Sequence, residues 1–270
     1  MRKTALAASG FALVFALSAC GGDGGNNASG GSGNFFDNPQ ELVKAASAQT
    51  EAAKTSKYEM TMSAAGMEIK ANGVGRYDGE NTAMSMNMEM MGQSIEIRFV
   101  DMTMYMKVPP EAAAQMGGKE WAKIDAESAG AQGEQFDQIA QQSDPTKTLE
   151  YIQEAGEITG SEETTIDGQK ATHYKIDLDF AKIADEMGSS SGMTPEQAQQ
   201  LADQVGTLPM ELWLNEENLP LKVTMDMGAI MEAAGAPQSE SKMEMTYSDW
   251  GTEVEVEAPP ADQVGEMPAF

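Results

Sequence analysis

Methionine recurs at every second position in several short stretches of this chain. In residues 83–91, AMSMNMEMM, five of the nine residues are methionine. The thioether sulfur is a soft metal ligand, and the unbranched side chain adapts to apolar surfaces of varied shape. Three kinds of structure would use such a stretch: a Cu(I) site made of thioethers, an apolar wall for a hydrophobic ligand, or an ordinary packed core.

Alternation with a period of two places every second side chain on the same face of a β-strand. Between the alternating methionines of residues 84–90 lie the polar residues Ser85, Asn87 and Glu89. The pattern therefore predicts a half-buried sheet with one apolar and one polar face. The same alternation returns at residues 58–62, 67–71, 95–99, 102–106, 221–227 and 243–247.

We predict that this apolar face binds a hydrophobic ligand, because flexible methionines accept ligands of varied shape. The predicted ligand-binding residues are Met60, Met62, Met84, Met86, Met88, Met90, Ile95, Ile97, Phe99, Met102, Met104, Met106, Leu212, Leu214, Val223, Met225, Met227, Met243 and Met245.

Two other interpretations of the methionines stay open. Residues i and i+2 of one strand lie about 6.6 Å apart, so their sulfurs share a Cu(I) ion only if side chains converge or neighbouring strands contribute. The one histidine, His173, lies beside Tyr174 in a predicted strand and is interpreted as a structural residue. We therefore predict no metal site and no cofactor, with Cu(I) binding and a closed core as alternatives.

Two amphipathic helices are predicted over residues 180–187 and 194–205, joined by a Gly/Ser segment. Apolar residues recur there at i, i+3, i+4 and i+7, the spacing of a helix with one apolar face. We predict that this pair of helices covers the cavity through Phe180, Ile183, Met187, Leu201 and Val205.

Together with the remaining elements, these patterns predict an α+β fold. Asn38 followed by Pro39 starts a helix that runs to about residue 55. One antiparallel sheet of about ten or eleven strands then carries helices across its apolar face. Other predicted elements are a weak helix at 136–139, a helix from 145, a hairpin turning at 167–168, and a last strand at 253–257 that ends at Pro259-Pro260.

The sequence offers no catalytic constellation. The match to G-x-S-x-G at residues 188–192 is the Gly/Ser segment between the two predicted helices and not a strand-to-helix turn, so it is no nucleophile elbow for His173 to serve. The glycine-rich segments lack the Lys-Ser/Thr ending of a phosphate loop. Glu162-Glu163 and the pair Asp177 and Asp179 are arrangements that a strongly acidic sheet face yields by chance. We predict that the protein is not an enzyme and has no catalytic residues.

The first residues predict export and lipid anchoring. Arg2 and Lys3 precede the apolar stretch 5–17, which has the length of a signal peptide. It ends in Leu-Ser-Ala-Cys, a bacterial lipobox whose Cys20 is the only cysteine in the chain. We predict a signal peptide (1–19), a lipidated Cys20 on a flexible tether (20–34), one domain (35–260) and a C-terminal tail (261–270). The protein would then lie on the outer face of the cell membrane.

The charge of the chain limits its partners. Without Arg2 and Lys3, the remaining 15 basic residues against 43 acidic ones give a formal charge of −28. Nucleic acid is excluded as a partner, because no basic patch neutralises phosphates. An anionic bilayer surface would also repel the domain, so we expect it to stand away from the membrane on its tether.

Several phrases resemble the actinobacterial lipoproteins of the LppX/LprAFG group. The lipobox, TIDGQKATHYKIDLD, ELWLNEENLPLKVTMDM and the closing YSDWGTEVEVEAPPADQV carry the resemblance over most of the mature chain. That group shares a half-barrel fold with the LolA-type lipoprotein carriers. The resemblance implies a strongly curved antiparallel sheet, helices across its concave face, and a cavity for acyl chains of lipids or lipoglycans. It offers no catalytic residues, and this chain departs from it in using methionine where Val, Leu and Phe are expected.

These observations predict a membrane-anchored lipoprotein that binds, and carries, an acylated lipid or lipoglycan. The alternatives are a Met-rich Cu(I)-binding protein and an envelope-assembly or adhesion protein whose acidic face binds a protein partner.

Overall fold

The structure is a computed structural model of the 270-residue chain. It describes residues 35–64, 66–78, 82–90, 92–101, 103–125, 145–190, 193–233, 235 and 241–266. The chain divides into two compact units, Met1–Gly33 and Asn34–Phe270, and every described residue belongs to the second. The predicted signal peptide, Cys20, the tether, the weak helix at 136–139 and Met102 therefore lie outside the described residues.

One sheet of twelve strands forms the centre of the second unit, in the order β12-β6-β5-β4-β3-β2-β1-β11-β10-β9-β8-β7. Neighbouring strands pair antiparallel except β12 and β6, and the first and last strands of this order do not pair, so the sheet is open. The strands are β1 (Thr55–Ala64), β2 (Met67–Arg76), β3 (Ala83–Met90), β4 (Gln93–Val100), β5 (Thr103–Lys107), β6 (Trp121–Asp125), β7 (Gly156–Ile166), β8 (Gln169–Asp179), β9 (Thr207–Asn215), β10 (Pro220–Asp226), β11 (Lys242–Ser248) and β12 (Val264–Glu266).

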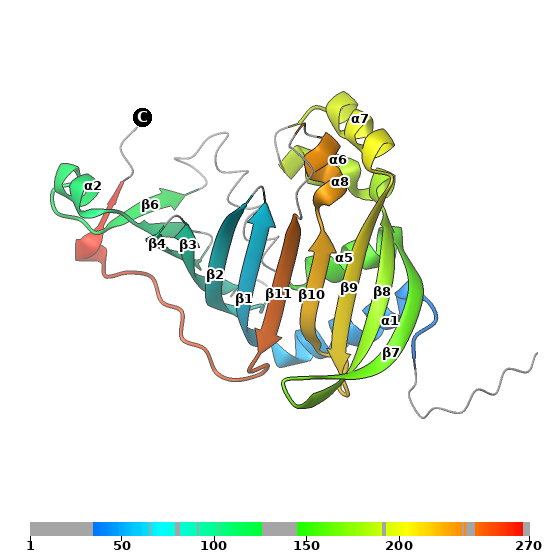
Figure 1. Ribbon diagram of the computed structural model, residues 1–270. Helices are drawn as coiled ribbons and strands as arrows, with labels where there is room; N and C mark the ends of the chain where they lie inside the picture. Colours follow the sequence, from blue (N-terminus) through cyan, green and yellow to red (C-terminus); the bar gives the residue numbers. More distant parts are fainter. Residues whose placement is uncertain are drawn as a thin grey trace, which may run out of the picture. The chain divides into compact units, whose positions relative to one another are not determined.

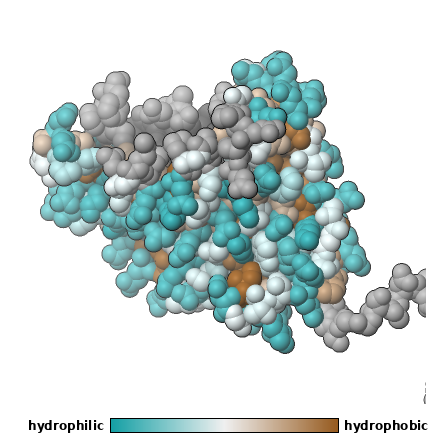
Figure 2. Space-filling view, in the orientation of Figure 1, coloured by the Kyte–Doolittle hydropathy of each residue, from teal (hydrophilic) through white to brown (hydrophobic). Residues whose placement is uncertain are grey.

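The α+β class and the open antiparallel sheet are confirmed, with twelve strands where about ten or eleven were expected. Strand direction rotates progressively from β8 to β4, as the twist of a large sheet requires (Figure 1). The face of the sheet turned to the viewer carries mainly hydrophilic residues (Figure 2), and helices α1 and α5 lie behind it.

Local sequence sets the ends of the helices. The side chain of Asn38 accepts a hydrogen bond from the Glu41 amide at 2.8 Å and caps α1. Thr194 and Gln197 form a reciprocal capping box at the start of α7, so both predicted helix starts are confirmed. The helices are α1 (Pro39–Ala53), α2 (Pro110–Gln115), α5 (Pro145–Ala155), α6 (Phe180–Ser190), α7 (Pro195–Val205), α8 (Gly228–Ala233) and the 3-10 turn η3 (Ala261–Gln263).

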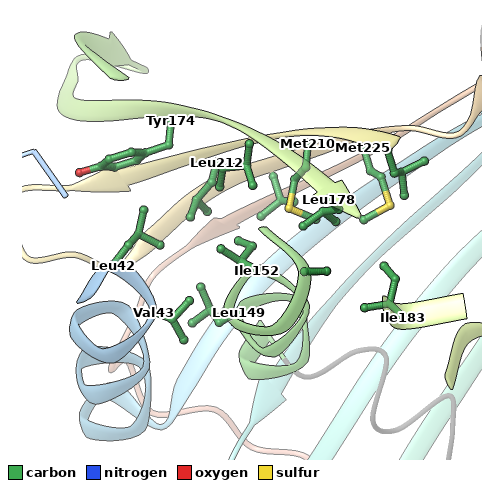
Figure 3. Packing of buried hydrophobic residues seen from close by; sticks show 14 of the residues in the cluster. Leu42, Val43, Leu149, Ile152, Tyr174, Leu178, Ile183, Met210, Leu212 and Met225 are labelled. Carbon is green, nitrogen blue, oxygen red and sulfur yellow. The ribbon is translucent and has the colours of Figure 1, made fainter. Parts of the chain in front are cut away.

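The main core lies between the helices and strands β8, β9 and β10. Leu42 of α1 and Ile152 of α5 are fully buried and point toward the apolar side chains of β8 and β9 (Figure 3). Ile183 of α6 belongs to the same cluster. Among the described residues, no helix is both long and apolar enough to cross a membrane.

The predicted strand at 253–257 is wrong. These residues have no strand pairing and run as an extended segment, with Val256 buried in a small second cluster against Ala83 and Val100. Ala83 precedes Met84 and Val100 follows Phe99, so both side chains point away from the methionine face. The segment therefore packs on the opposite, outer face of the sheet through the side chain of Val256.

The chain then continues into the sheet, past the predicted boundary of the domain at residue 260. The Thr55 hydroxyl donates to the Thr252 carbonyl at 2.7 Å, and Arg98 donates to the Glu257 carbonyl at 3.3 Å. Beyond them β12 pairs in parallel with β6. We call residues 252–266 the C-terminal strap. This segment is hydrogen-bonded to β1 at Thr252 and ends in β12, at the far edge of the sheet.

Candidate ligand-binding face

Strand register shows which side chains share the apolar face, because directly paired residues point to the same side of a sheet. The first row crosses β9, β10, β11, β1 and β2 through Met210, Met225, Met243, Met62 and Ile69. A second row runs parallel to it through Leu212, Val223, Met245, Met60, Ala71, Met88 and Ile95.

Two further rows complete the face on strands β1 to β6. One contains Tyr247, Tyr58, Gly73, Met86, Ile97, Met106 and Ala122, and the other contains Gly75, Met84, Phe99, Met104 and Ile124. The predicted positions on these strands therefore lie on one side of one sheet.

Burial divides this face into two parts. On β9 and β10 the predicted residues are closed off by the helices and belong to the main core: Leu212 (0% exposed), Leu214 (1%), Val223 (3%) and Met225 (5%). Met227 packs against the same core, and on β3 to β5 Met84, Phe99 and Met104 are buried as well. We call the second part, which is only half-buried, the open Met face; it consists of Met60, Met62, Met86, Met88, Ile95, Ile97, Met106, Met243 and Met245. Three of these residues, Met86, Met243 and Met245, also pack against the edge of the main core and so join the two parts.

The residues predicted to cover the cavity also belong to the closed part. Phe180, Ile183 and Val205 are buried in the main core, and Leu201 packs against it. Helices α6 and α7 approach closely, since a Cβ on Gly188 would lie 2.7 Å from the Cβ of Ala198. The side chains of Met90 and Met187 lie outside the described part of the structure.

A cavity of about 950 Å³ opens where the open Met face ends, between β4, β5 and α2. Ile95 and Met106 line it together with the apolar residues Val108 and Ala113. Sequence reasoning missed this cavity because no helix was predicted after the alternating residues 102–106. Pro110 is in fact the first residue of α2, a position that proline favours.

A second cavity, of about 700 Å³, lies near the tip of the β7–β8 hairpin. The acidic residues Glu59, Asp167, Glu217 and Asp249 line it, and half of its other lining residues are polar. Its chemistry does not suit a hydrocarbon chain.

Small residues in β2 make room for a tyrosine on the apolar face. A Cβ on Gly73 would lie 2.6 Å from the hydroxyl of Tyr58, so the Tyr58 ring occupies the space of the missing side chain. Tyr58 is 5% exposed, and this burial, with the nearby Tyr77, raises the pKa of its hydroxyl above the ordinary value.

His173 lies on the outer face, away from the methionines. It is 8% exposed and stacks on Trp213 with ring centroids 4.3 Å apart. Its Nδ1 is 3.1 Å from a Glu162 oxygen, while Nε2 is 3.4 Å from a Glu211 oxygen without hydrogen-bond geometry. Within the described ranges, no three or more His, Cys, Asp or Glu side chains are grouped to hold a metal ion.

The methionine row bears directly on the Cu(I) alternative. Met210, Met225, Met243 and Met62 follow one another on four adjacent strands. Directly paired residues lie about 4.5–5.5 Å apart, closer than residues i and i+2 of one strand. Thioethers from neighbouring strands can therefore converge in a way that a single strand does not permit.

Comparison with known proteins gives one relative in sequence. No protein-family model matches the chain. An uncharacterized 31.2 kDa protein of the rplA–rplJ intergenic region of Streptomyces griseus is 25% identical over 245 residues, which are 83% of this chain and 77% of the relative.

Among solved structures, the chain is similar to LprF from Mycobacterium bovis, with 17% identity and a TM-score of 0.48 over 82% of this chain and 96% of LprF. MucB, solved in complex with MucA, matches at 12% identity and a TM-score of 0.34, and the match spans 86% of this chain but only 60% of MucB. A DUF1329 family protein from Desulfovibrio piger matches at 10% identity and a TM-score of 0.25, over 82% of this chain and 96% of that protein.

Proposed function

We propose that the protein binds the acyl chains of a lipid or lipoglycan on the open Met face. The observation that carries this proposal is the division of one continuous apolar face into a closed part and a half-buried part that ends in a cavity. A monomeric domain rarely leaves a contiguous apolar surface of this kind without a ligand or partner for it.

The chemistry of the face suits hydrocarbon. Each CH₂ group removed from water contributes about 0.8 kcal/mol, so one acyl chain supplies enough free energy for tight binding. The cavity of about 950 Å³ between β4, β5 and α2 is as large as typical pockets for small ligands. Methionine side chains can rearrange around chains of different length, which a carrier of lipids requires.

The predicted lipid anchor at Cys20 places this binding domain at the membrane that holds its ligand. A tether of about 14 residues has a root-mean-square reach of about 20 Å, which keeps the acidic domain near the bilayer without contact. We therefore propose an exported, membrane-anchored lipoprotein that binds acylated lipids and acts without catalysis.

Native mass spectrometry of the Cys20→Ser protein, purified from a bacterial envelope, tests the proposal. We expect co-purified masses that denaturation releases as diacyl or triacyl lipids. A bare mass that added diacyl lipid does not shift would contradict the proposal.

A matched pair of variants locates the site. Met88→Asp places a charge on the open Met face, between its paired neighbours Ala71 and Ile95. Asn87→Asp adds the same charge one residue earlier, on the exposed outer face. A buried charge is strongly unfavourable, so we expect Met88→Asp to weaken binding of a fluorescent diacyl lipid at least tenfold and Asn87→Asp to leave it unchanged. Equal effects would place the lipid elsewhere.

The row of four methionines on adjacent strands supports Cu(I) binding as a second candidate function. Met243→Leu removes one of the two inner sulfurs of that row and keeps nearly the same volume. Lipid binding should survive this substitution, whereas a thioether site should lose Cu(I) affinity. Titration of both proteins with Cu(I) and with lipid separates the two functions. A protein that binds neither would direct attention to its acidic outer face as an interface for an envelope protein.

A further inference from the structure

One buried hydroxyl at the edge of the open Met face has no partner. Ser241 is 2% exposed, and its Oγ makes no hydrogen bond within the described structure. Buried side-chain hydroxyls in native proteins are almost always hydrogen-bonded, because an unpaired one loses its bonds to water without replacement. Such a group calls for an explanation.

The backbone shows where this hydroxyl lies. The Met227 amide donates to the Ser241 carbonyl at 2.7 Å, which continues the ladder between β10 and β11 by one residue. Along β11, Lys242 and Glu244 are on the outer face and Met243 and Met245 on the apolar face. Alternation therefore assigns Ser241 to the methionine side, opposite Met227 and one row beyond the first row.

The described neighbours of Ser241 in the ladder and along the chain include apolar residues of the main core. Met227, opposite Ser241, and Met243, two residues further along, both pack against that core, as do Ala229 and Ile230 of α8. A polar group of a bound ligand would supply the hydrogen-bond partner that this hydroxyl lacks. From the hydroxyl, the open Met face extends over five strand-to-strand steps to β5, a distance of about 24 Å. This span suits an extended fatty acyl chain whose far end enters the cavity beside α2.

We propose that Ser241 Oγ donates a hydrogen bond to the carbonyl that links an acyl chain to the rest of the ligand. This inference rests on the proposed function and deepens it: the ligand is oriented, with its acyl linkage at the α8 end and its tail toward β5. Ser241 is then a specificity residue that distinguishes acyl-linked lipids from ether-linked lipids, whose chains are equally apolar but lack the carbonyl.

The test compares a diester phospholipid with the diether phospholipid of the same chains and head group. One neutral hydrogen bond corresponds to a preference for the ester of roughly five- to tenfold. We expect the wild-type protein to show this preference and Ser241→Ala to lose it through weaker ester binding, with ether binding unchanged. Ser248→Ala, at the exposed end of the same strand, is the control and should keep the preference.

Thermal unfolding of the lipid-free proteins shows whether a change in lipid binding results from a folding defect. Without lipid, Ser241→Ala should unfold no earlier than the wild-type protein, because the lost hydroxyl had no bond to give up. Equal affinity of the wild-type protein for both lipids, or a preference that survives in Ser241→Ala, would overturn the inference while leaving the proposed function intact. Binding of neither lipid to the wild-type protein would overturn both.

Discussion

Tyr58 shows how a single residue shapes the apolar face. Its ring lies over Gly73 in the neighbouring strand, and its burial raises the pKa of the hydroxyl. The desolvation of the charged form is the larger cause, and the nearby Tyr77 adds to it. The hydroxyl therefore stays neutral in the folded protein at pH values where it ionises in the unfolded chain.

This difference predicts alkaline sensitivity. Below the unfolded pKa, which is about 10, Tyr58 is neutral in both states and has no effect on the pH dependence. As pH rises from there toward the folded pKa, only the unfolded chain releases the proton, so the free energy of unfolding falls by about 1.4 kcal/mol per pH unit. We expect Tyr58→Phe to remove this slope, as measured by urea unfolding between pH 9 and 11.

Burial also raises the pKa of Tyr174, so some alkaline sensitivity should remain in Tyr58→Phe. Tyr174→Phe therefore serves as the second variant, and the double variant should be the least sensitive of the three. Slopes identical in the wild-type protein and Tyr58→Phe would show that Tyr58 is accessible to solvent in the folded state.

At the scale of the element, the close packing of β2 against its neighbouring strands requires glycine at position 73. A Cβ on Gly73 would lie 2.2 Å from the backbone oxygen of Ser85, and the pairing of β2 with β3 prevents that oxygen from moving away. We expect Gly73→Ala to lower the free energy of unfolding by about 2 kcal/mol through overpacking. Chemical denaturation measures this directly.

Gly160 in β7 provides the matched control. A Cβ there would have only the Cδ atom of Lys175 nearby, at 3.9 Å, which is an ordinary contact. Gly160→Ala should therefore change stability by no more than about 0.5 kcal/mol. Equal losses in both variants would show that the contact with Ser85 does not explain the effect, because Gly160 has no such contact.

At the scale of the whole molecule, the C-terminal strap holds the far end of the sheet. Among the described strands, β6 pairs only with β5 and with β12 of the strap. Val256 covers the small cluster of Ala83 and Val100 on the outer face. The strap thus stabilises the strands that border the cavity beside α2.

Truncation tests this role. A chain that ends at Gly251 lacks the strap, and we expect amide hydrogen exchange to accelerate in β5 and β6 while β8 and β9 keep their protection within the main core. A chain that ends at Glu266 keeps the strap and is the control. Unchanged exchange in β6 after the longer truncation would show that the strap contributes nothing to the stability of this edge.

The sequence alone determined which side chains share a face. Alternation of Met84, Met86 and Met88 with polar residues is a local property of an extended chain, and the register confirms it across neighbouring strands. Helix starts at Asn38 and Thr194 were equally predictable, because a cap is satisfied by atoms two or three residues away.

Only the tertiary structure decided which part of that face is closed. Met225 and Met60 have the same alternating context, yet one is buried under helices and the other is half-buried, because the helices pack on one part of the sheet. Val254 and Val256 alternate as a strand would, but segment 253–257 lies across the sheet surface without pairing. In both cases the deciding contacts join residues far apart in the chain. A periodic pattern shows which side chains share a face, but not which distant segment packs against that face.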